Sequence, residues 1–294
     1  MTYPAGPPTP PPYPSGPPPG APAACVRHPD RPTGLSCNRC GRPACPECLR
    51  EASVGYQCVD CVGQAQRSVR RGTTVAGAVP GERPVVVPTL IALNAVIFVW
   101  TVVQAGSVSA NVNAALFGEW ALVPERVATG EWWRVLTSGF LHVGPIHLAF
   151  NMLALWILGR DMEAVLGRGR FLAVYLIALL GGAAAVILFG VPSQPVAGAS
   201  GAVFGLMGGL AVVLRRMQVP AGQVVGLIVV NVVISVLIPG ISLIGHLGGL
   251  VVGAAATAAL VYATGRNRTV VQVGALGALT VLVLAAILVG AALG

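Results

Sequence analysis

A serine and a histidine lie in two separate apolar stretches of this 294-residue chain. Ser200 follows Gly198-Ala199 at the start of one stretch, and His246 is followed by Leu247-Gly248-Gly249 in the other. Polar and ionisable groups are costly to bury in lipid, so they are functional candidates by default. Near neutral pH, histidine is the usual base that takes the proton of a serine hydroxyl. The pair predicts a nucleophile and its general base within a bilayer.

Glycines at every fourth residue would let the two stretches pack closely as helices. The first stretch has Gly201, Gly205 and Gly209, and the second has Gly245, Gly249 and Gly253. Small residues at this spacing allow helix backbones to touch. The alternative is that the glycines serve packing alone and that Ser200 bonds to its own backbone. Phe204 shares a helical face with Ser200 and could stack on His246; otherwise it is an ordinary core or lipid-facing side chain.

Another apolar stretch opens with three polar side chains. His147 and Asn151 are four residues apart and therefore share one helical face. Both are suited to donate hydrogen bonds to an oxyanion, and the backbone N–H of Ser200 would be a further donor if it lies at a helix N-terminus. The alternative is a metal site that includes His142. The absence of a nearby thiol or carboxylate disfavours it.

Seven apolar segments approach the roughly 20 residues that a helix needs to cross the hydrocarbon core. They cover residues 86–105, 144–159, 170–190, 200–214, 223–239, 243–263 and 270–293. The second and fourth are short, which suits helices that end beside a water-filled cavity. The loop over residues 106–143 contains three tryptophans, which favour the headgroup region, and we expect it to be partly re-entrant. With a mean hydropathy of +0.77, the chain is predicted to be an all-α polytopic membrane protein.

The arginines predict the orientation of these spans. They fall in the loops after the second, fourth and sixth spans: Arg160, Arg168, Arg170, Arg215, Arg216, Arg266 and Arg268. Cytoplasmic loops are rich in basic residues, so the N-terminus should be cytoplasmic and the C-terminus extracytoplasmic. The net charge of +8 is explained by this distribution, and we expect no nucleic-acid partner.

All seven cysteines lie near the N-terminus in knuckle-like pairs. The pairs are Cys25 with His28, Cys37 with Cys40, Cys45 with Cys48, and Cys58 with Cys61. Eight such ligands suit two tetrahedral zinc ions with no open position, which predicts structural zinc and a module that folds with its metal. A cytoplasmic location disfavours disulfides. Before this module, residues 1–24 are Pro-rich and are expected to be a disordered tail.

Taken together, these motifs resemble the rhomboid family of intramembrane serine proteases over about residues 85–263. That resemblance also covers Glu131-Trp132-Trp133-Arg134, which is similar to the family's Trp-Arg loop motif. It implies a six-helix core and a catalytic Ser–His dyad without an aspartate. The resemblance implies that Ser200 is the nucleophile, that His246 is the base, and that His147 and Asn151 belong to the oxyanion hole. Phe204 would support His246, and His142 would lie near the active-site water or oxyanion network. Gly198 and Gly201 flank the serine in its motif, and Trp133 with Arg134 would stabilise the loop over residues 106–143.

The predicted organisation has five parts. These are the tail (1–24), a two-zinc module (25–62), a basic linker (63–84), the protease core (85–263) and an additional transmembrane helix (264–294). The module resembles B-box zinc fingers, which would join the first pair with the third and the second with the fourth; sequential pairing is the alternative. Catalysis itself would need no cofactor.

The resemblance implies an endopeptidase that cleaves transmembrane segments of other proteins. The lack of lysine and the Ala/Gly/Val-rich composition lead us to expect a bacterial inner membrane. The zinc module could recruit a cytoplasmic protein partner. An alternative is a proteolytically inactive rhomboid-like protein that binds transmembrane clients. A transporter or channel is disfavoured, because the spans offer few polar or charged residues to line a path.

Overall fold

The computed structural model describes residues 23–68, 72–79 and 83–293. The chain forms two compact units, Met1–Arg71 and Gly72–Gly294. The predicted Pro-rich tail lies outside the described residues except for its last two positions. The two units are described separately.

The described part of the first unit, residues 23–68, consists of two small hairpins, a 3-10 turn and a helix. Strands β1 (Ala24–Cys25) and β2 (His28–Pro32) pair antiparallel, as do β3 (Leu49–Glu51) and β4 (Tyr56–Cys58). A 3-10 turn, η1 (Pro46–Cys48), precedes β3, and helix α1 (Val59–Ser68) follows β4. Six of the eight buried apolar side chains in the described part of this unit are cysteines, and the other two are Ala44 and Leu49. So small an apolar core is typical of units that fold together with a bound metal ion.

Seven long helices form the second unit. They are α2 (Val86–Ala105), α6 (Gly144–Leu166), α7 (Arg168–Phe189), α8 (Ser200–Arg216), α9 (Gly222–Leu237), α10 (Leu243–Val261) and α11 (Arg268–Leu293). Among the described residues, α2, α7, α10 and α11 are each long and apolar enough to span a membrane, and α6 forms a further candidate with the bent segment before it. The predicted class, an all-α polytopic membrane protein, is confirmed.

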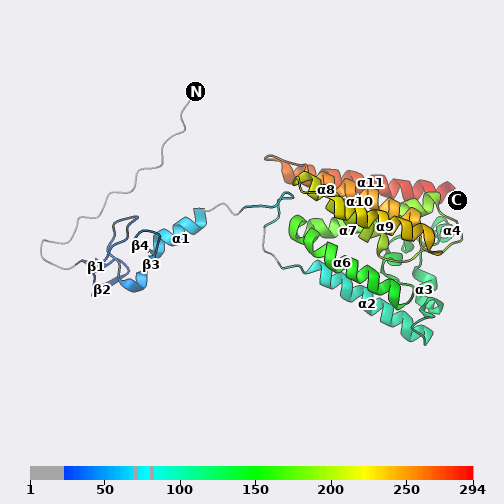
Figure 1. Ribbon diagram of the computed structural model, residues 1–294, viewed down its shortest axis with the longest axis horizontal. Coiled ribbons are helices and arrows are strands. Elements are labelled where there is room, and N and C mark those ends of the chain that lie inside the picture. Colours follow the sequence, from blue (N-terminus) through cyan, green and yellow to red (C-terminus); the bar gives the residue numbers. More distant parts are fainter. Residues whose placement is uncertain (1–22, 69–71, 80–82, 294) are drawn as a thin grey trace, which may run out of the picture. The chain divides into compact units, whose positions relative to one another are not determined.

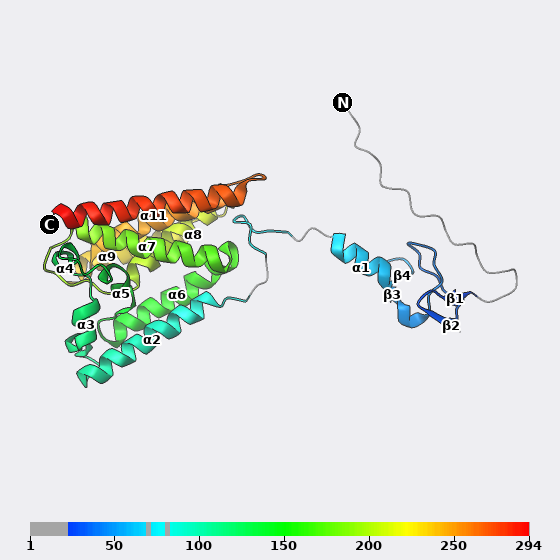
Figure 2. The ribbon, with the colours of Figure 1, turned by 180° about the vertical axis from the view of Figure 1, so that it is seen from behind.

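Helix α7 lies at the centre of the bundle and contacts both α8 and α10, which pack on each other (Figure 1). Figure 2 shows α11 running along α7 from the other side, while α2 packs against α6. The loop between α2 and α6 holds short helices, and its last part, Arg134–Phe140, forms a pair with α6 that is bent by 93°. The short helices are η2 (Asn111–Asn113), α3 (Ala115–Trp120), α4 (Pro124–Ala128), α5 (Arg134–Thr137) and η3 (Ser138–Phe140).

Two parts of the second unit differ from the sequence-based expectation. Helix α6 continues through Arg160 to Leu166, and the carboxylate of Glu163 in this extension is buried and accepts three backbone N–H groups at the start of α2. Part of the expected linker is also packed into the core. Ala76 is fully buried, and its carbonyl accepts a hydrogen bond from Gln272 of α11.

Candidate active site

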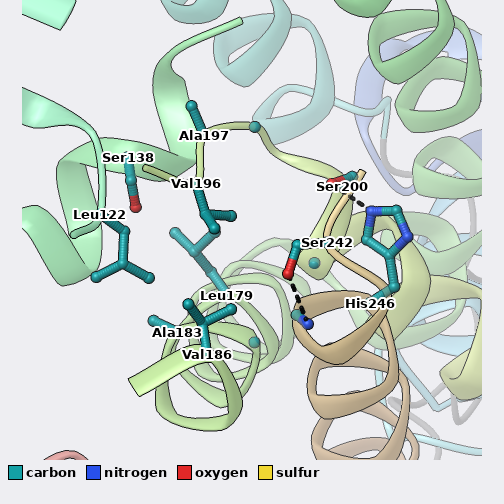
Figure 3. Close-up of a pocket in the computed structure, with 14 residues that line it drawn as sticks. Leu122, Ser138, Leu179, Ala183, Val186, Val196, Ala197, Ser200, Ser242 and His246 are labelled. Carbon is teal, nitrogen blue, oxygen red and sulfur yellow. Dashed lines mark hydrogen bonds between the residues drawn. The ribbon is translucent and has the colours of Figure 1, made fainter. Parts of the chain in front are cut away.

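Ser200 and His246 meet at the N-terminal ends of α8 and α10. The Oγ of Ser200 lies 2.8 Å from the Nε2 of His246, within hydrogen-bond range (Figure 3). Ser200 begins α8, and His246 stands in the first turn of α10, where the Ser242 hydroxyl caps the helix by accepting from the N–H of Gly245. Two residues 46 positions apart are thereby brought into the geometry of a nucleophile and its base.

The glycine stripes place the two helix backbones in contact. A Cβ on Gly249 would lie 2.0 Å from the carbonyl oxygen of Gly201, and one on Gly253 would lie 2.4 Å from the Cα of Gly205. Real Cβ atoms essentially never approach within 3.0 Å. Only glycine permits this separation between α8 and α10, and the separation in turn allows the short side chain of Ser200 to reach the imidazole.

The imidazole of His246 is held from two further directions. The ring of Phe204 stacks on it, with centroids 4.2 Å apart and ring planes 16° apart. On its far side, the Nδ1 of His246 lies 2.8 Å from the hydroxyl of Ser235 in α9. The sequence analysis missed Ser235. The signal was present, because Asn231 and Ser235 are two polar residues one turn apart in an otherwise apolar helix.

His147 and Asn151 lie on α6, as their spacing predicts. His147 faces the backbone at Gly198, where an added Cβ would be 2.8 Å from His147 Cε1 and 3.5 Å from Ser200 Oγ. Gly198 has a φ of 134°, which side-chain-bearing residues rarely adopt, so this close approach requires glycine. The amide nitrogen of Asn151 donates to the carbonyl of His147, while its buried oxygen has no partner among the described residues.

His142 is almost fully buried and stands behind His147, with ring centroids 5.1 Å apart. Neither of its ring nitrogens has a hydrogen-bond partner among the described residues. Its carbonyl oxygen accepts from Asn111, whose side-chain oxygen also accepts the N–H of Gly144. Asn111 therefore holds the turn that leads into α6, a role that the sequence did not reveal.

The Trp-Arg motif lies in the loop between α2 and α6. Arg134 is buried, pairs with Glu131 and donates to the carbonyls of Gly118 and Ala121, each at 2.8 Å. Trp133 donates from its indole nitrogen to the carbonyl of Glu119, and half of its surface is exposed. These bonds tie α3 to α5, so the motif pins the loop and takes no direct part in the Ser200–His246 contact.

A small cavity of about 40 Å³ opens beside the serine (Figure 3). Its lining includes Ser200, His246, Gly182, Ala183 and Val186, and most of its other side chains are also small or apolar. Space of this size admits a water molecule or a small side chain. His147 and Asn151 are not among the residues that line it. His147 approaches the turn before the serine from the α6 side.

The eight predicted metal ligands form two clusters in the first unit. One contains Cys25, His28, Cys45 and Cys48, and the other contains Cys37, Cys40, Cys58 and Cys61. The first pair thus joins the third and the second joins the fourth, which is the cross-braced arrangement and not the sequential one. All seven cysteines are free of disulfides.

The separations within these clusters fit a tetrahedral zinc ion. With zinc–sulfur bonds of about 2.3 Å, two ligand sulfurs should lie ~3.8 Å apart. The Cys40 and Cys58 sulfurs are 3.8 Å apart, and the Nδ1 of His28 lies 3.4 Å from Cys45 and 3.3 Å from Cys48. Burial opposes ionisation of the Cys37 thiol, yet nearby backbone N–H groups, including that of Cys58, lower its pKa to about 6. A thiolate is the form that zinc requires.

The fold and this site define a polytopic helical membrane protein in which a serine and a histidine meet inside the helix bundle. Residues 129–263 match the Rhomboid domain family. The chain is 38% identical over 192 residues to the rhomboid protease GluP of Bacillus subtilis, covering 64% of this chain and 37% of that protein.

Other relatives align over shorter regions. The putative rhomboid protease YdcA of Bacillus subtilis is 34% identical over 42% of this chain and 65% of its own length. The rhomboid protease AarA of Providencia stuartii is 38% identical over 32% of this chain and 34% of its own length. This chain therefore spans less than two thirds of the length of these relatives.

Proposed function

We propose that the chain is an intramembrane serine endopeptidase that cleaves transmembrane segments of other proteins. The observation that carries the proposal is the 2.8 Å contact between Ser200 Oγ and His246 Nε2 inside a bundle of membrane-spanning helices. A serine and a histidine in this relation form the core of a nucleophilic site, and such a pair has no evident packing role in an apolar bundle. The homologous rhomboid proteases add support.

In the proposed reaction, the Oγ of Ser200 attacks a backbone carbonyl of the substrate while Nε2 of His246 takes the hydroxyl proton. The carbonyl carbon gains a bond to Oγ and its oxygen becomes an oxyanion. Collapse of this intermediate breaks the C–N bond, and His246 returns the proton to the leaving amine. Water then attacks the acyl-enzyme with the same base, releasing the carboxylate and restoring the serine.

Three groups are proposed to stabilise the oxyanion. The backbone N–H of Ser200 is at the start of α8, where the first amides of a helix have no partner within it. His147 borders the same backbone turn, and Asn151 stands one helical turn further along α6. Donors aimed at the developing charge are commonly the largest single contribution to such catalysis.

We further propose that the site opens toward the extracytoplasmic side of a bacterial inner membrane. His147, Ser200 and His246 all stand in the first turns of their helices, whereas Arg215 and Arg216 occupy the last turn of α8. Basic residues favour the cytoplasmic side, which places the catalytic ends of α6, α8 and α10 opposite.

The first unit is proposed to hold two structural zinc ions. Each four-ligand cluster fills a tetrahedral coordination sphere and leaves no position for a substrate. The metal would supply folding energy to a unit with little apolar core, and the surface it stabilises would serve a cytoplasmic protein partner.

Cleavage of a reporter transmembrane segment in proteoliposomes tests the catalytic proposal. The wild-type protein should cut the reporter, and Ser200→Ala should insert and fold normally but leave the reporter intact. Cleavage by purified Ser200→Ala would overturn the assignment. A folded wild-type protein that binds transmembrane segments without cutting any of them, and that does not react with serine-directed probes, would support the inactive client-binding alternative.

A further inference from the structure

The second ring nitrogen of His246 is hydrogen-bonded to a side chain from a third helix. All of α9 lies in the described part of the chain, and Ser235 is its one buried residue. The Oγ of Ser235 lies 2.8 Å from Nδ1 of His246 and 2.7 Å from the carbonyl oxygen of Asn231, one helical turn before it. Helix α9 thus reaches the active site through this hydroxyl.

The positions of the protons follow from counting donors. A serine hydroxyl has one hydrogen, and Ser235 donates it to the Asn231 carbonyl. Its oxygen can then only accept from His246, so Nδ1 carries the imidazole proton. Nε2 is left with a lone pair, which accepts the hydroxyl hydrogen of Ser200. In this arrangement, every donor in the chain from Ser200 to Asn231 has an acceptor.

The opposite arrangement leaves one donor unpaired. If Ser235 donated to Nδ1, the imidazole proton would lie on Nε2 and point at the oxygen of Ser200. The hydroxyl hydrogen of Ser200 would then need another acceptor, and no other hydrogen bond of that hydroxyl exists within the described residues. Ser200 is partly buried, and a hydroxyl hydrogen left without an acceptor there loses the hydrogen bond that the first arrangement provides, so the first arrangement is favoured.

We propose that Ser235 is a positioning residue that holds His246 in the tautomer with the proton on Nδ1. The inference rests on the proposed function, because only the lone pair on Nε2 can take the proton of Ser200. An imidazole in the other tautomer cannot act as the base, and the orienting partner of a catalytic histidine serves this purpose in hydrolases with a triad. In this site the orienting partner of His246 is the uncharged hydroxyl of Ser235, which is itself oriented by the backbone carbonyl of Asn231.

Substitution of Ser235 should separate this role from simple packing. Ser235→Ala leaves Nδ1 without a partner and should lower kcat about tenfold to a hundredfold with little change in KM, as expected for a lost buried hydrogen bond. Ser235→Thr should restore most of the rate, because a helical threonine hydroxyl can also bond to the carbonyl one turn back. Val236→Ala, at an exposed neighbouring position, is the matched control and should leave both constants unchanged.

A spectroscopic readout tests the tautomer directly in the unmodified full-length chain. With only four histidines, the ¹⁵N-histidine NMR spectrum is simple enough to assign His246 from its absence in His246→Gln. The expected spectrum has a protonated Nδ1 and an unprotonated Nε2. Ser235→Ala should shift both signals toward tautomer averaging, and Ser235→Thr should not.

The outcomes distinguish this inference from the proposed function. A proton on Nε2 in the wild-type protein, or an unchanged kcat in Ser235→Ala, would overturn the role of Ser235. The protease assignment is tested separately, and it stands if the wild-type protein cleaves the reporter and Ser200→Ala does not. Cleavage that survives Ser200→Ala would overturn the protease assignment. If Ser235→Ala does not fold, the wild-type spectrum still decides whether the proton lies on Nδ1.

Discussion

Replacing Gly249 by alanine should separate the two helices that carry the catalytic pair. The new Cβ would lie 2.0 Å from the carbonyl oxygen of Gly201, whereas such contacts are essentially never closer than 3.0 Å. The Cβ would be fixed directly to the backbone of α10 and the oxygen belongs to the backbone of α8, so no flexible side chain can move aside. Helices α8 and α10 must therefore move apart by about 1 Å, the difference between those two distances.

A displacement of about 1 Å is enough to break the hydrogen bond between Ser200 and His246. Ser200 precedes Gly201, and His246 lies one helical turn before Gly249. A shift of about 1 Å would lengthen the 2.8 Å contact between Oγ and Nε2 to ~3.8 Å, outside hydrogen-bond range. A misplacement of about 1 Å can cost roughly a hundredfold in rate. Overpacking should also lower the free energy of unfolding by ~1–3 kcal/mol.

The assay is the kcat for reporter cleavage in proteoliposomes, measured beside the rate of labelling by a fluorophosphonate. Both should fall about a hundredfold in Gly249→Ala. The matched control is Gly277→Ala in α11, where an added Cβ meets no atom within 4 Å and both rates should stay at the wild-type value. Full activity in a folded Gly249→Ala protein would refute the argument that backbone contact positions the pair.

Three other substitutions test separate parts of the structure. Phe204→Ala removes the ring stacked on His246 and should lower kcat about twofold to tenfold, as expected for an aromatic pair of ~0.5–1.5 kcal/mol. Glu163→Gln removes the charge that accepts three N–H groups of α2 and should destabilise the folded protein by ~2 kcal/mol, seen as a lower Tm. Cys48→Ser should reduce bound zinc from two ions per chain to one, measured by plasma mass spectrometry.

Each of these substitutions has a contrary outcome. An unchanged kcat in Phe204→Ala would mean that the stacked ring does not orient the base. An unchanged Tm in Glu163→Gln would show that a neutral amide caps α2 as well as the carboxylate. Retention of two zinc ions in Cys48→Ser, or loss of both, would contradict two independent four-ligand sites.

Much of the helical architecture is readable from the sequence, because transmembrane helices must satisfy their own backbone hydrogen bonds within long apolar segments. The segment 86–105 coincides with α2, and the expected spans around Ser200 and His246 begin where α8 and α10 begin. The sequence also paired Ser200 with His246. Both are polar residues in apolar helices whose glycine spacing predicts close packing, and the structure brings them together.

Features that depend on contacts between distant segments were not readable. The sequence placed Glu163 in the loop after the span 144–159, because a charged residue is not expected to continue an apolar span. Its burial depends on the start of α2, whose backbone N–H groups the carboxylate accepts, and this contact is not visible in the sequence. Ser235 was missed although it lies one helical turn after Asn231, because that spacing does not indicate that His246 faces it. The cross-braced cysteine pairs likewise required the folded hairpins, because their spacing is compatible with either pairing.

The central claim is that the hydroxyl of Ser200 is activated by His246. Its most direct test is to treat the full-length protein in proteoliposomes with a fluorophosphonate and to map the adduct by peptide mass spectrometry. The account predicts one adduct, on Ser200, that is absent from His246→Gln. Reporter cleavage without any adduct on Ser200, or equal labelling of Ser200 in the two proteins, would contradict it.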